Sequence, residues 1–207
     1  MPAASTAWIH WIIKTGVYMN VTLQRNNKIL LRDKAALLII DIQEKILPVM
    51  NNPSQVINNT LKLIKGFKVL NIPIFYTEQY PKGLGSTTEA LLTELEGLSP
   101  IQKTSFSCYG AGNFFTRLID NNVSQVVVAG IESHVCVQQT VLDLAANNFQ
   151  VNVAADAVSS RNDLDYKISL DRMRVHGAEV TTSEAILFEL LVDCGTDEFS
   201  EISKIIK

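Results

Sequence analysis

The chain has 207 residues, of which 47% are hydrophobic and 19% charged, a composition typical of a soluble globular protein. Its net charge of -3 and its 18 scattered Lys and Arg residues give no basic surface of the kind that binds a phosphate backbone, so we expect no nucleic-acid partner. The three cysteines are too few and too widely spaced for a disulfide framework or a paired zinc-ligand motif. They indicate reduced thiols and a cytoplasmic location.

The N-terminal segment contains an apolar run at residues 7–13, which is interrupted by His10 and followed by Lys14. A membrane-spanning helix needs about 20 apolar residues, and a signal peptide begins with basic residues. We therefore expect neither a membrane anchor nor a signal peptide. Residues 1–33 are predicted to be an N-terminal extension that is partly disordered, with an interaction segment as the alternative. Residues 34–207 are predicted to form one domain.

From residue 34 onward, short apolar runs alternate with amphipathic stretches, which is the pattern of repeated strand–helix units. The clearest strand is at 35–40, a continuous apolar run of the kind that is buried on both faces of a parallel sheet. Five further strands are expected at residues 72–76, 101–102, 125–129, 151–154 and 179–181.

The stretches between these strands have helical periodicity. The first helix is expected after Ser54, where apolar residues recur every three or four positions. Ser86 and Glu89 are spaced as a capping box, which predicts the start of a second helix. Further helices are expected at residues 113–119, 135–147, 163–176 and 183–192.

Six strands in this arrangement predict a three-layer αβα fold with a doubly wound, mostly parallel sheet, because right-handed crossovers place helices on both faces. In such sheets a ligand binds beyond the carboxyl ends of the strands, where the strand order reverses. Asp41 ends the first predicted strand, Lys103 follows the third, and Cys136 lies past the fourth, near the start of a helix. We therefore expect these three side chains at one edge of the sheet.

The three residues have complementary chemistry. A thiol attacks a carbonyl group as the thiolate, which a base, a nearby cation or a helix N-terminus can generate and stabilise. Asp41 could accept the thiol proton, Lys103 could stabilise the thiolate, and the helix start near Cys136 favours negative charge. Taken singly, Asp41 could be a strand-end cap and Lys103 a solvated loop charge. Cys108 and Cys194 are interpreted as buried core residues.

Four segments resemble motifs of the isochorismatase-like hydrolase superfamily, and the resemblance covers residues 34 to about 205. The segment with sequence TEQYPKGLG further resembles the isochorismatase domain-containing subgroup. The segments are LIIDIQ at 38–43, TEQYPKGLG at 77–85, KTSFS at 103–107 and AGIESHVCV at 129–137.

The resemblance implies a Rossmann-like topology and a catalytic triad, with Asp41 as the base, Lys103 as the second member and Cys136 as the nucleophile. It also implies a cis peptide bond between Ile131 and Glu132. The N–H groups of Glu132 and Cys136 would then form an oxyanion hole.

Two differences from members of this superfamily bear on the reaction. True isochorismatases lack the nucleophilic cysteine, so Cys136 argues against isochorismate as the substrate. Nicotinamidases carry a metal-binding aspartate and histidines after the second strand, where this chain has the sequence TEQY at 77–80. We therefore expect no metal and no other cofactor.

Together these features predict a metal-independent cysteine hydrolase that acts on a small amide or carbamoyl substrate through a covalent Cys136 intermediate. The same intermediate would serve an ester or a thioester. The alternative is a weakly active or vestigial member of the superfamily, retained as an oligomeric binding or assembly protein. The predicted substrate-binding residues are Gln43, Tyr80, Phe106 and His134, with a surface or packing role as the alternative for His134.

A homo-oligomer is expected, because members of this superfamily commonly assemble. Ile202, Ile205 and Ile206 near the C-terminus offer an apolar surface for that contact. A small-molecule substrate and further copies of the chain are thus the expected partners.

Overall fold

The computed structural model describes residues 8–9, 21–22 and 24–207. Two short strands, β1 (Trp8–Ile9) and β2 (Val21–Thr22), pair in antiparallel orientation. Most of the predicted N-terminal extension, including His10 and Lys14, lies outside the described residues, so its proposed disorder stays a prediction. Within the described part of the chain, no helix is long and apolar enough to cross a membrane.

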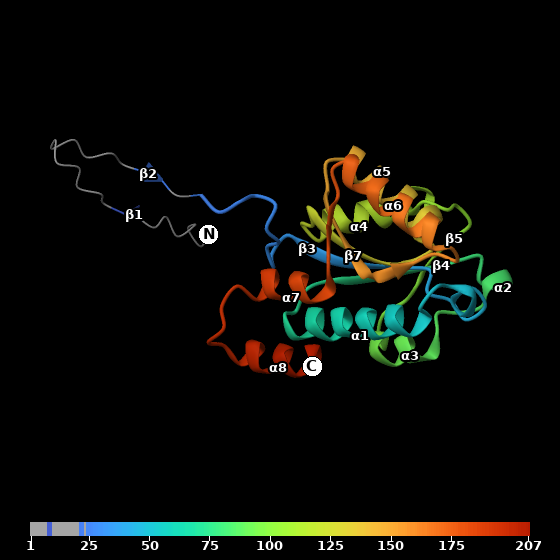
Figure 1. The fold of residues 1–207 in the computed structure, drawn as a ribbon, viewed down its shortest axis with the longest axis horizontal. Coiled ribbons are helices and arrows are strands. Elements are labelled where there is room, and N and C mark those ends of the chain that lie inside the picture. Colours follow the sequence, from blue (N-terminus) through green and yellow to red (C-terminus); the bar gives the residue numbers. More distant parts are fainter. Residues whose placement is uncertain (1–7, 10–20, 23) are drawn as a thin grey trace.

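The rest of the chain is organised around a six-stranded sheet in which every neighbouring pair of strands is parallel (Figure 1). The strand order is β5-β4-β3-β6-β7-β8, so the chain reverses its direction of travel across the sheet between β3 and β6. The predicted fold class and all six predicted strands are confirmed. Their bounds are β3 (Ala35–Ile40), β4 (Ile74–Gln79), β5 (Ile101–Lys103), β6 (Gln125–Ile131), β7 (Gln150–Ser159) and β8 (Glu179–Thr181).

Helices cover both faces of the sheet in Figure 1. One face carries α1 (Pro53–Val69), α3 (Glu89–Leu92), α7 (Ser183–Leu191) and α8 (Asp197–Ile206). The other face carries α4 (Phe114–Asp120), α5 (Gln138–Ala146) and α6 (Asp163–Val175). The short helix α2 (Pro81–Leu84) follows β4. Shorter turns are 3-10 helices at Leu47–Val49, Thr93–Leu95 and Cys108–Gly110 and a π-helix at Ser133–Val137.

The central strand β3 separates two hydrophobic cores. Its six residues are all buried, and successive side chains point to opposite faces of the sheet. Leu37 and Ile39 belong to the core under α1, α7 and α8, whereas Leu38 and Ile40 belong to the core under α4, α5 and α6. The continuous apolar run in the sequence is therefore explained by burial on both faces.

Two helix starts differ from the predictions. Ser86 and Glu89 do not form a capping box, because α3 begins at Glu89 with Thr88 as its N-cap and without a side-chain cap. The segment predicted as one helix at 135–147 is a π-helix over Ser133–Val137 that continues directly into α5. A π-helical turn of this kind is rare and frequently marks a functional site.

The C-terminal helix α8 was missed by the sequence analysis, and it corrects the proposed contact surface. Thr196 caps this helix by accepting a hydrogen bond from the N–H of Phe199. Ile202 is fully buried, and Ile206 packs against the core beneath α1. Ile205 is partly exposed. The C-terminal isoleucines therefore mainly complete the core of their own chain and offer little free apolar surface.

Gly130 allows β6 to lie against β3 next to the carboxyl edge of the sheet. It pairs with Ile40 in the parallel ladder, and its φ of +132° is a conformation that residues with a side chain rarely adopt. A Cβ atom at this position would lie 2.2 Å from the carbonyl oxygen of Ile40. That oxygen belongs to the backbone of a central strand and has little freedom to move.

We predict that Gly130→Ala lowers the free energy of unfolding by about 3 kcal/mol or more, because it combines a backbone clash with strained φ. Urea denaturation followed by circular dichroism measures the loss. Gly112→Ala is the matched control, since Gly112 has a φ of +55° but open space around it. Its cost should be only about 1 to 2 kcal/mol. Equal losses in the two variants would contradict the close approach.

Candidate active site

Asp41 and Lys103 form a buried ion pair at the carboxyl ends of β3 and β5. The Lys103 Nζ atom lies 2.6 Å from Asp41 Oδ2, and the two side chains are only 0% and 3% exposed. Asp41 directly follows β3 and has a positive φ of 53°, so the chain turns sharply there. Each charge compensates the other's loss of hydration, because burying either charge alone would be strongly destabilising.

Further hydrogen bonds hold both members of the ion pair. Lys103 Nζ donates to the carbonyl oxygens of Ser105 and Phe106 at 3.2 and 3.0 Å, and Thr77 Oγ1 donates to Asp41 Oδ1 at 2.7 Å. Burial alone would lower the pKa of Lys103, but the nearby Asp41 carboxylate and the Cys136 and Cys108 sulfurs outweigh it and raise that pKa above its ordinary value. Lys103 is therefore fixed as an ammonium group whose hydrogen bonds are used within the protein.

Cys136 lies in the π-helix that follows β6. Its Sγ atom donates a hydrogen bond to Gln79 Oε1 at 3.2 Å, and Gln79 is the last residue of β4. Thr140, one turn later, donates from its hydroxyl group to the Cys136 carbonyl oxygen at 2.7 Å. The thiol is thus held between the start of a helix and the end of β4, on the same edge of the sheet as the ion pair.

The surroundings of Cys136 favour the protonated thiol. Burial and, after it, the negative charge of Asp41 raise the pKa of the Cys136 thiol far above its ordinary value, against the opposing effect of Lys103. The stabilised resting thiolate expected from the sequence is therefore not what the geometry supports, because Lys103 is already neutralised by Asp41. A neutral thiol beside a carboxylate is arranged for proton transfer rather than for a preformed ion pair with lysine.

The segment between β6 and the π-helix positions several groups near the thiol. The peptide bond between Ile131 and Glu132 is cis. The carboxylate of Glu132 pairs with Arg161 at 2.9 Å. Ser133 and Ser160 share a hydrogen bond between their hydroxyl groups. The loop that follows β7 is thereby tied to the segment that carries Cys136.

A pocket of about 290 Å³ opens at this edge of the sheet, large enough for a small organic molecule. Two half-exposed aromatic residues, Tyr80 and Phe106, lie among its lining residues together with four aliphatic residues. The lining consists of Asp41, Ile46, Gln79, Tyr80, Leu84, Phe106, Ile131, Glu132, Val135 and Cys136.

The structure brings most, but not all, of the predicted site residues to this pocket. Gln43 lies behind it, where its side chain bonds the backbone N–H and C=O of Gln79 and the carbonyl oxygen of Gly85. Gln43 thus braces the strand end that carries Gln79. His134 points away from the lining, because its Nδ1 atom lies 2.9 Å from Ser160 Oγ. These contacts agree with the packing role that was the alternative for His134.

Two residues that contact Asp41 or Cys136 were not singled out from the sequence. Thr77 bonds Asp41, and Gln79 accepts the hydrogen bond of the Cys136 thiol. Both belong to the TEQYPKGLG segment, which was quoted as a motif without roles for these side chains. Their position at the end of the second strand was the available signal, since the carboxyl ends of neighbouring parallel strands meet at one edge.

Among the residues that the structure describes, no three His, Cys, Asp or Glu side chains converge in a way that could hold a metal ion. His10 lies outside the described residues. His134 and His176 are engaged in other contacts, with Ser160 Oγ and with the carbonyl oxygen of Arg172 respectively. Metal independence itself stays a prediction, which the experiments below test.

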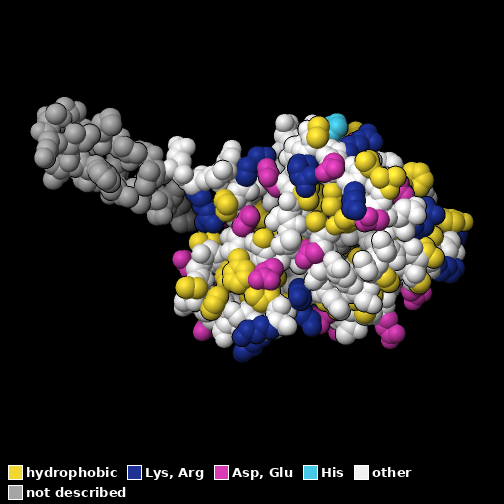
Figure 2. All heavy atoms as spheres, viewed as in Figure 1, with side chains coloured by type: hydrophobic (Ala, Val, Ile, Leu, Met, Phe, Trp, Pro, Cys, Tyr) yellow, Lys and Arg dark blue, Asp and Glu magenta, His cyan; other side chains and the backbone are white. Residues whose placement is uncertain are grey.

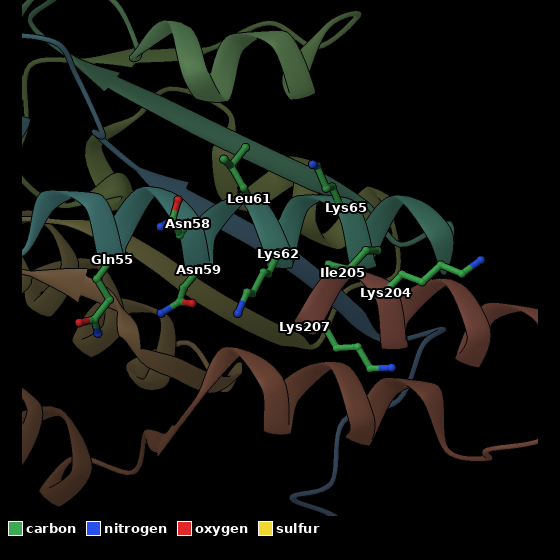
Figure 3. Close-up of a pocket in the computed structure, with 9 residues that line it drawn as sticks. All are labelled: Gln55, Asn58, Asn59, Leu61, Lys62, Lys65, Lys204, Ile205 and Lys207. Atoms are coloured by element: carbon green, nitrogen blue, oxygen red, sulfur yellow. The ribbon is translucent and has the colours of Figure 1, made fainter.

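A larger hollow, of about 810 Å³, is lined by none of these residues. It lies between α1 and α8, and Figure 3 shows that its lysine side chains point in different directions. Lys62 donates to the carbonyl oxygen of Ile206, and Lys65 pairs with Glu94. The smaller pocket that contains Cys136 is therefore the candidate active site.

The charges around Cys136 predict opposite pH shifts in two variants. Lys103→Met removes the charge that lowers the pKa of the thiol, so alkylation of Cys136 should require a higher pH. Asp41→Asn removes the charge that raises this pKa, so alkylation should begin at a lower pH. Each shift should amount to about one pH unit or more. Iodoacetamide labelling rates across pH, resolved by peptide mapping, measure both.

Of the two other cysteines, Cys194 serves as the internal reference in this experiment. Cys194 is exposed, whereas Cys108 is fully buried and burial raises its pKa to about 11. Labelling of Cys194 should be the same in both variants, whereas Cys108, whose pKa Lys103 and Asp41 also shift, should stay unlabelled in the folded protein because it is fully buried. Shifts of the same sign in both variants, or no shift in either, would contradict the assigned charges.

Comparisons with known proteins identify the family of this chain. Residues 35–185 match the isochorismatase domain family. Isochorismatase domain-containing protein 2 of Danio rerio is 38% identical over 172 residues, which are 83% of this chain and 86% of that protein. The MAR1 ribonuclease of Caenorhabditis elegans superposes with a TM-score of 0.79 at 37% identity and covers 86% of this chain and 91% of its own.

A more distant structure shares the fold. It is the YcaC gene product of Escherichia coli, an octameric hydrolase of unknown specificity, with a TM-score of 0.82 at 23% identity over 88% of this chain and 92% of that one. The family match and the 38% identical relative both extend over most of the α/β domain. The chain therefore belongs to the isochorismatase domain family and has its hydrolase fold.

Proposed function

We propose that this protein is a metal-independent cysteine hydrolase that cleaves the C–N bond of a small amide or carbamoyl compound. The observation that carries the proposal is that a buried Asp41–Lys103 ion pair and the Cys136 thiol meet at one pocket. A binding protein has no need of a nucleophile, a base and a cation at the same place. These are the parts that covalent catalysis requires.

The reaction follows from the protonation states of the resting site. Asp41 accepts the proton of the Cys136 thiol as the sulfur attacks the substrate carbonyl carbon. The tetrahedral intermediate collapses when the C–N bond breaks, and the leaving nitrogen takes the proton from Asp41. A thioester on Cys136 remains. A water molecule, deprotonated by Asp41, then attacks that thioester and restores the thiol.

Lys103 and the backbone divide the remaining tasks. Lys103 compensates the charge of the buried Asp41 carboxylate, which acts as the base. The N–H groups of Glu132 and Cys136 are proposed to stabilise the oxyanion, a contribution of about 3 to 4 kcal/mol per donor in other enzymes. Gln79 holds the thiol toward the pocket and can accept a hydrogen bond from the amide nitrogen of the substrate once the thiol proton has moved.

The pocket favours a substrate without negative charge. Its lining includes two carboxylates, Asp41 and Glu132, and each is paired with a cation that is not itself part of the lining. Ile46, Leu84 and Val135 provide apolar surface for the body of the substrate. A carboxylate on the substrate would therefore be desolvated beside negative groups, with no cation left to receive it.

We predict that a neutral amide is hydrolysed with a kcat/KM at least about tenfold above that of an analogue carrying a carboxylate, equivalent to about 1.4 kcal/mol. Glu132→Gln should lower this ratio of kcat/KM values, because Arg161 loses its carboxylate partner and can then pair with the carboxylate of the analogue. Steady-state kinetics on the matched pair of substrates measure both effects. A preference for the anionic analogue in the wild-type protein would contradict the electrostatic argument.

The name of the C. elegans relative raises RNA as an alternative substrate. The net charge of -3 and the two carboxylates at the pocket disfavour a polyanion. A single-stranded RNA is therefore included in the assays below. Cleavage of that RNA, abolished by Cys136→Ala, would replace the amide proposal with a nuclease.

The central experiment screens small uncharged amides and carbamoyl compounds with wild-type protein and with Cys136→Ala. Turnover should fall by a factor on the order of 10³ or more in the variant. Mass spectrometry of quenched wild-type protein should find the acyl or carbamoyl group on the peptide that contains Cys136. The double variant Asp41→Asn with Lys103→Met should be scarcely worse than the more damaging single variant, because the residues act as a unit.

The purified protein also serves to test metal dependence and the alternative of a vestigial enzyme. Dialysis against a chelator should leave turnover unchanged, and a stoichiometric metal lost together with activity would overturn metal independence. A folded protein without turnover or a Cys136 adduct on any compound would favour a vestigial enzyme kept for assembly. The three free cysteines support a reducing compartment, for which we propose the cytoplasm.

A further inference from the structure

A second pocket lies next to the pocket of about 290 Å³ that contains Cys136, which is called the catalytic pocket below. The second pocket has a volume of about 640 Å³, and Tyr80 belongs to the lining of both. Polar side chains contribute to it: Lys82 from α2, Gln102 from β5, and Thr104 just after β5. Figure 1 shows α2 beside the ends of β4 and β5, at the edge of the sheet that carries the candidate active site.

Lys103 connects the two pockets. Its side chain is 0% exposed although the residue as a whole is 5% exposed, so its backbone is the part that lines the second pocket. The side chain runs inward, and its Nζ atom bonds Asp41 and the carbonyl oxygen of Phe106. Asp41 and Phe106 both line the catalytic pocket. The two pockets are therefore neighbours across the side chain of one lysine.

The ring of Tyr80 lies between the two pockets and is held there by its surroundings. The backbone N–H of Tyr80 donates to the carbonyl oxygen of Lys103 at 2.9 Å. The ring lies directly on Gly83, where a Cβ atom would be 2.5 Å from the Tyr80 Cδ1 atom and 2.7 Å from its Cε1 atom. The missing side chain of Gly83 thus leaves the space that the ring occupies.

The two pockets differ in charge. Two carboxylates, Asp41 and Glu132, line the catalytic pocket, whereas no acidic residue is part of the lining of the second pocket. Lys82 is exposed there, and none of the ion pairs in the described part of the chain involves it. Figure 2 shows basic side chains at the right-hand end of the molecule, where Figure 1 places α2. The second pocket therefore suits an anionic group, which the catalytic pocket disfavours.

We propose that the substrate spans both pockets, with its scissile amide beside Cys136 and an anionic group beside Lys82. This inference rests on the proposed hydrolase function and adds a substrate class to it. The substrate is an amide that is uncharged near the bond to be cleaved and anionic at its distal end. The amide group of Gln102 and the hydroxyl group of Thr104 are further hydrogen-bond donors for the anion.

Tyr80 acts as the specificity residue in this arrangement. The part of the substrate between the amide and the anion must be long enough to pass the ring. A carboxylate on a short amide stays in the catalytic pocket, where it is desolvated beside negative groups. A carboxylate on a longer amide reaches Lys82. The effect of a negative charge on hydrolysis should therefore change sign with the length of the substrate.

Kinetics on a homologous series tests this dependence on length. Straight-chain amides that end in a carboxylate are each compared with the amide of equal length that ends in a hydroxyl group. The ratio of their kcat/KM values should be below one for the shortest pair and reach about two to five for longer pairs, as expected for an exposed charge pair. High salt should reduce this gain. A ratio below one at every length would overturn the proposal.

Variants of Lys82 test the cation. Lys82→Met should remove the gain of the longer carboxylates, and Lys82→Arg should keep it. The change should appear in KM rather than in kcat, because Lys82 is remote from the bond that breaks. Lys204→Met is the matched control, since Lys204 is an exposed lysine that lines a different hollow, beside α8. Equal ratios in the wild type and in Lys82→Met would contradict the role of this lysine.

Variants around Tyr80 test the ring. Tyr80→Ala should shift the preference for the carboxylate to shorter amides, because the substrate no longer has to pass the ring, whereas Tyr80→Phe should leave the preferred length unchanged. Gly83→Ala should also change that length, because the added methyl group displaces the ring from its position. Circular dichroism checks that each variant is folded. An unchanged preferred length in both Tyr80→Ala and Gly83→Ala would refute the assigned role of Tyr80.

A binding measurement separates this inference from the proposed reaction. Calorimetric titration of Cys136→Ala with a long carboxylate-ended amide should give a dissociation constant that Lys82→Met raises about twofold to fivefold. This dependence, found without hydrolysis of any amide by the wild type, would overturn the reaction and support the second pocket. Hydrolysis of uncharged amides, with no effect of Lys82→Met on binding or turnover of the charged ones, would support the reaction and overturn the second pocket.

Discussion

The buried ion pair between Asp41 and Lys103 is the interaction on which the rest of the site depends. The two charges lie 2.6 Å apart and almost out of contact with solvent, and removing one partner typically costs about 3 to 5 kcal/mol. The sheet topology meets this requirement, because β3 and β5 flank β4 and end at the same edge. Thr77, from the strand between them, supplies a further hydrogen bond to the carboxylate. The site is therefore a property of three neighbouring strands rather than of any one loop.

The ion pair also decides how the thiol is activated. Because the charge of Lys103 is used on Asp41 and on two backbone carbonyls, it is not free to hold a thiolate at rest. Burial and the Asp41 carboxylate raise the pKa of the Cys136 thiol, so in the proposed reaction the thiol loses its proton only when a substrate carbonyl group is in place. A thiol that stays protonated is oxidised and alkylated slowly, since the thiolate is the reactive form. Reactivity is then coupled to the presence of substrate.

The two faces of the domain have different roles. The core under α1, α7 and α8 is closed by the amphipathic C-terminal helix, whose Ile202 is completely buried. The opposite layer adjoins the candidate active site, because the first turn of α6 lies close to the segment that carries Cys136, with His134 Nε2 4.0 Å from Asp165 Oδ2.

The sequence alone determined the fold class, the six strands and the gathering of Asp41, Lys103 and Cys136 at one sheet edge. Continuous apolar runs specify buried parallel strands, and the carboxyl ends of such strands must meet. Only the tertiary structure decided that Gln79 holds the thiol, that Gln43 lies behind the pocket and that Ile202 is buried in the core of its own chain. These facts depend on which segments, far apart in the chain, lie next to one another and on which groups each side chain contacts there. Local periodicity carries no information about either, because it describes one segment at a time.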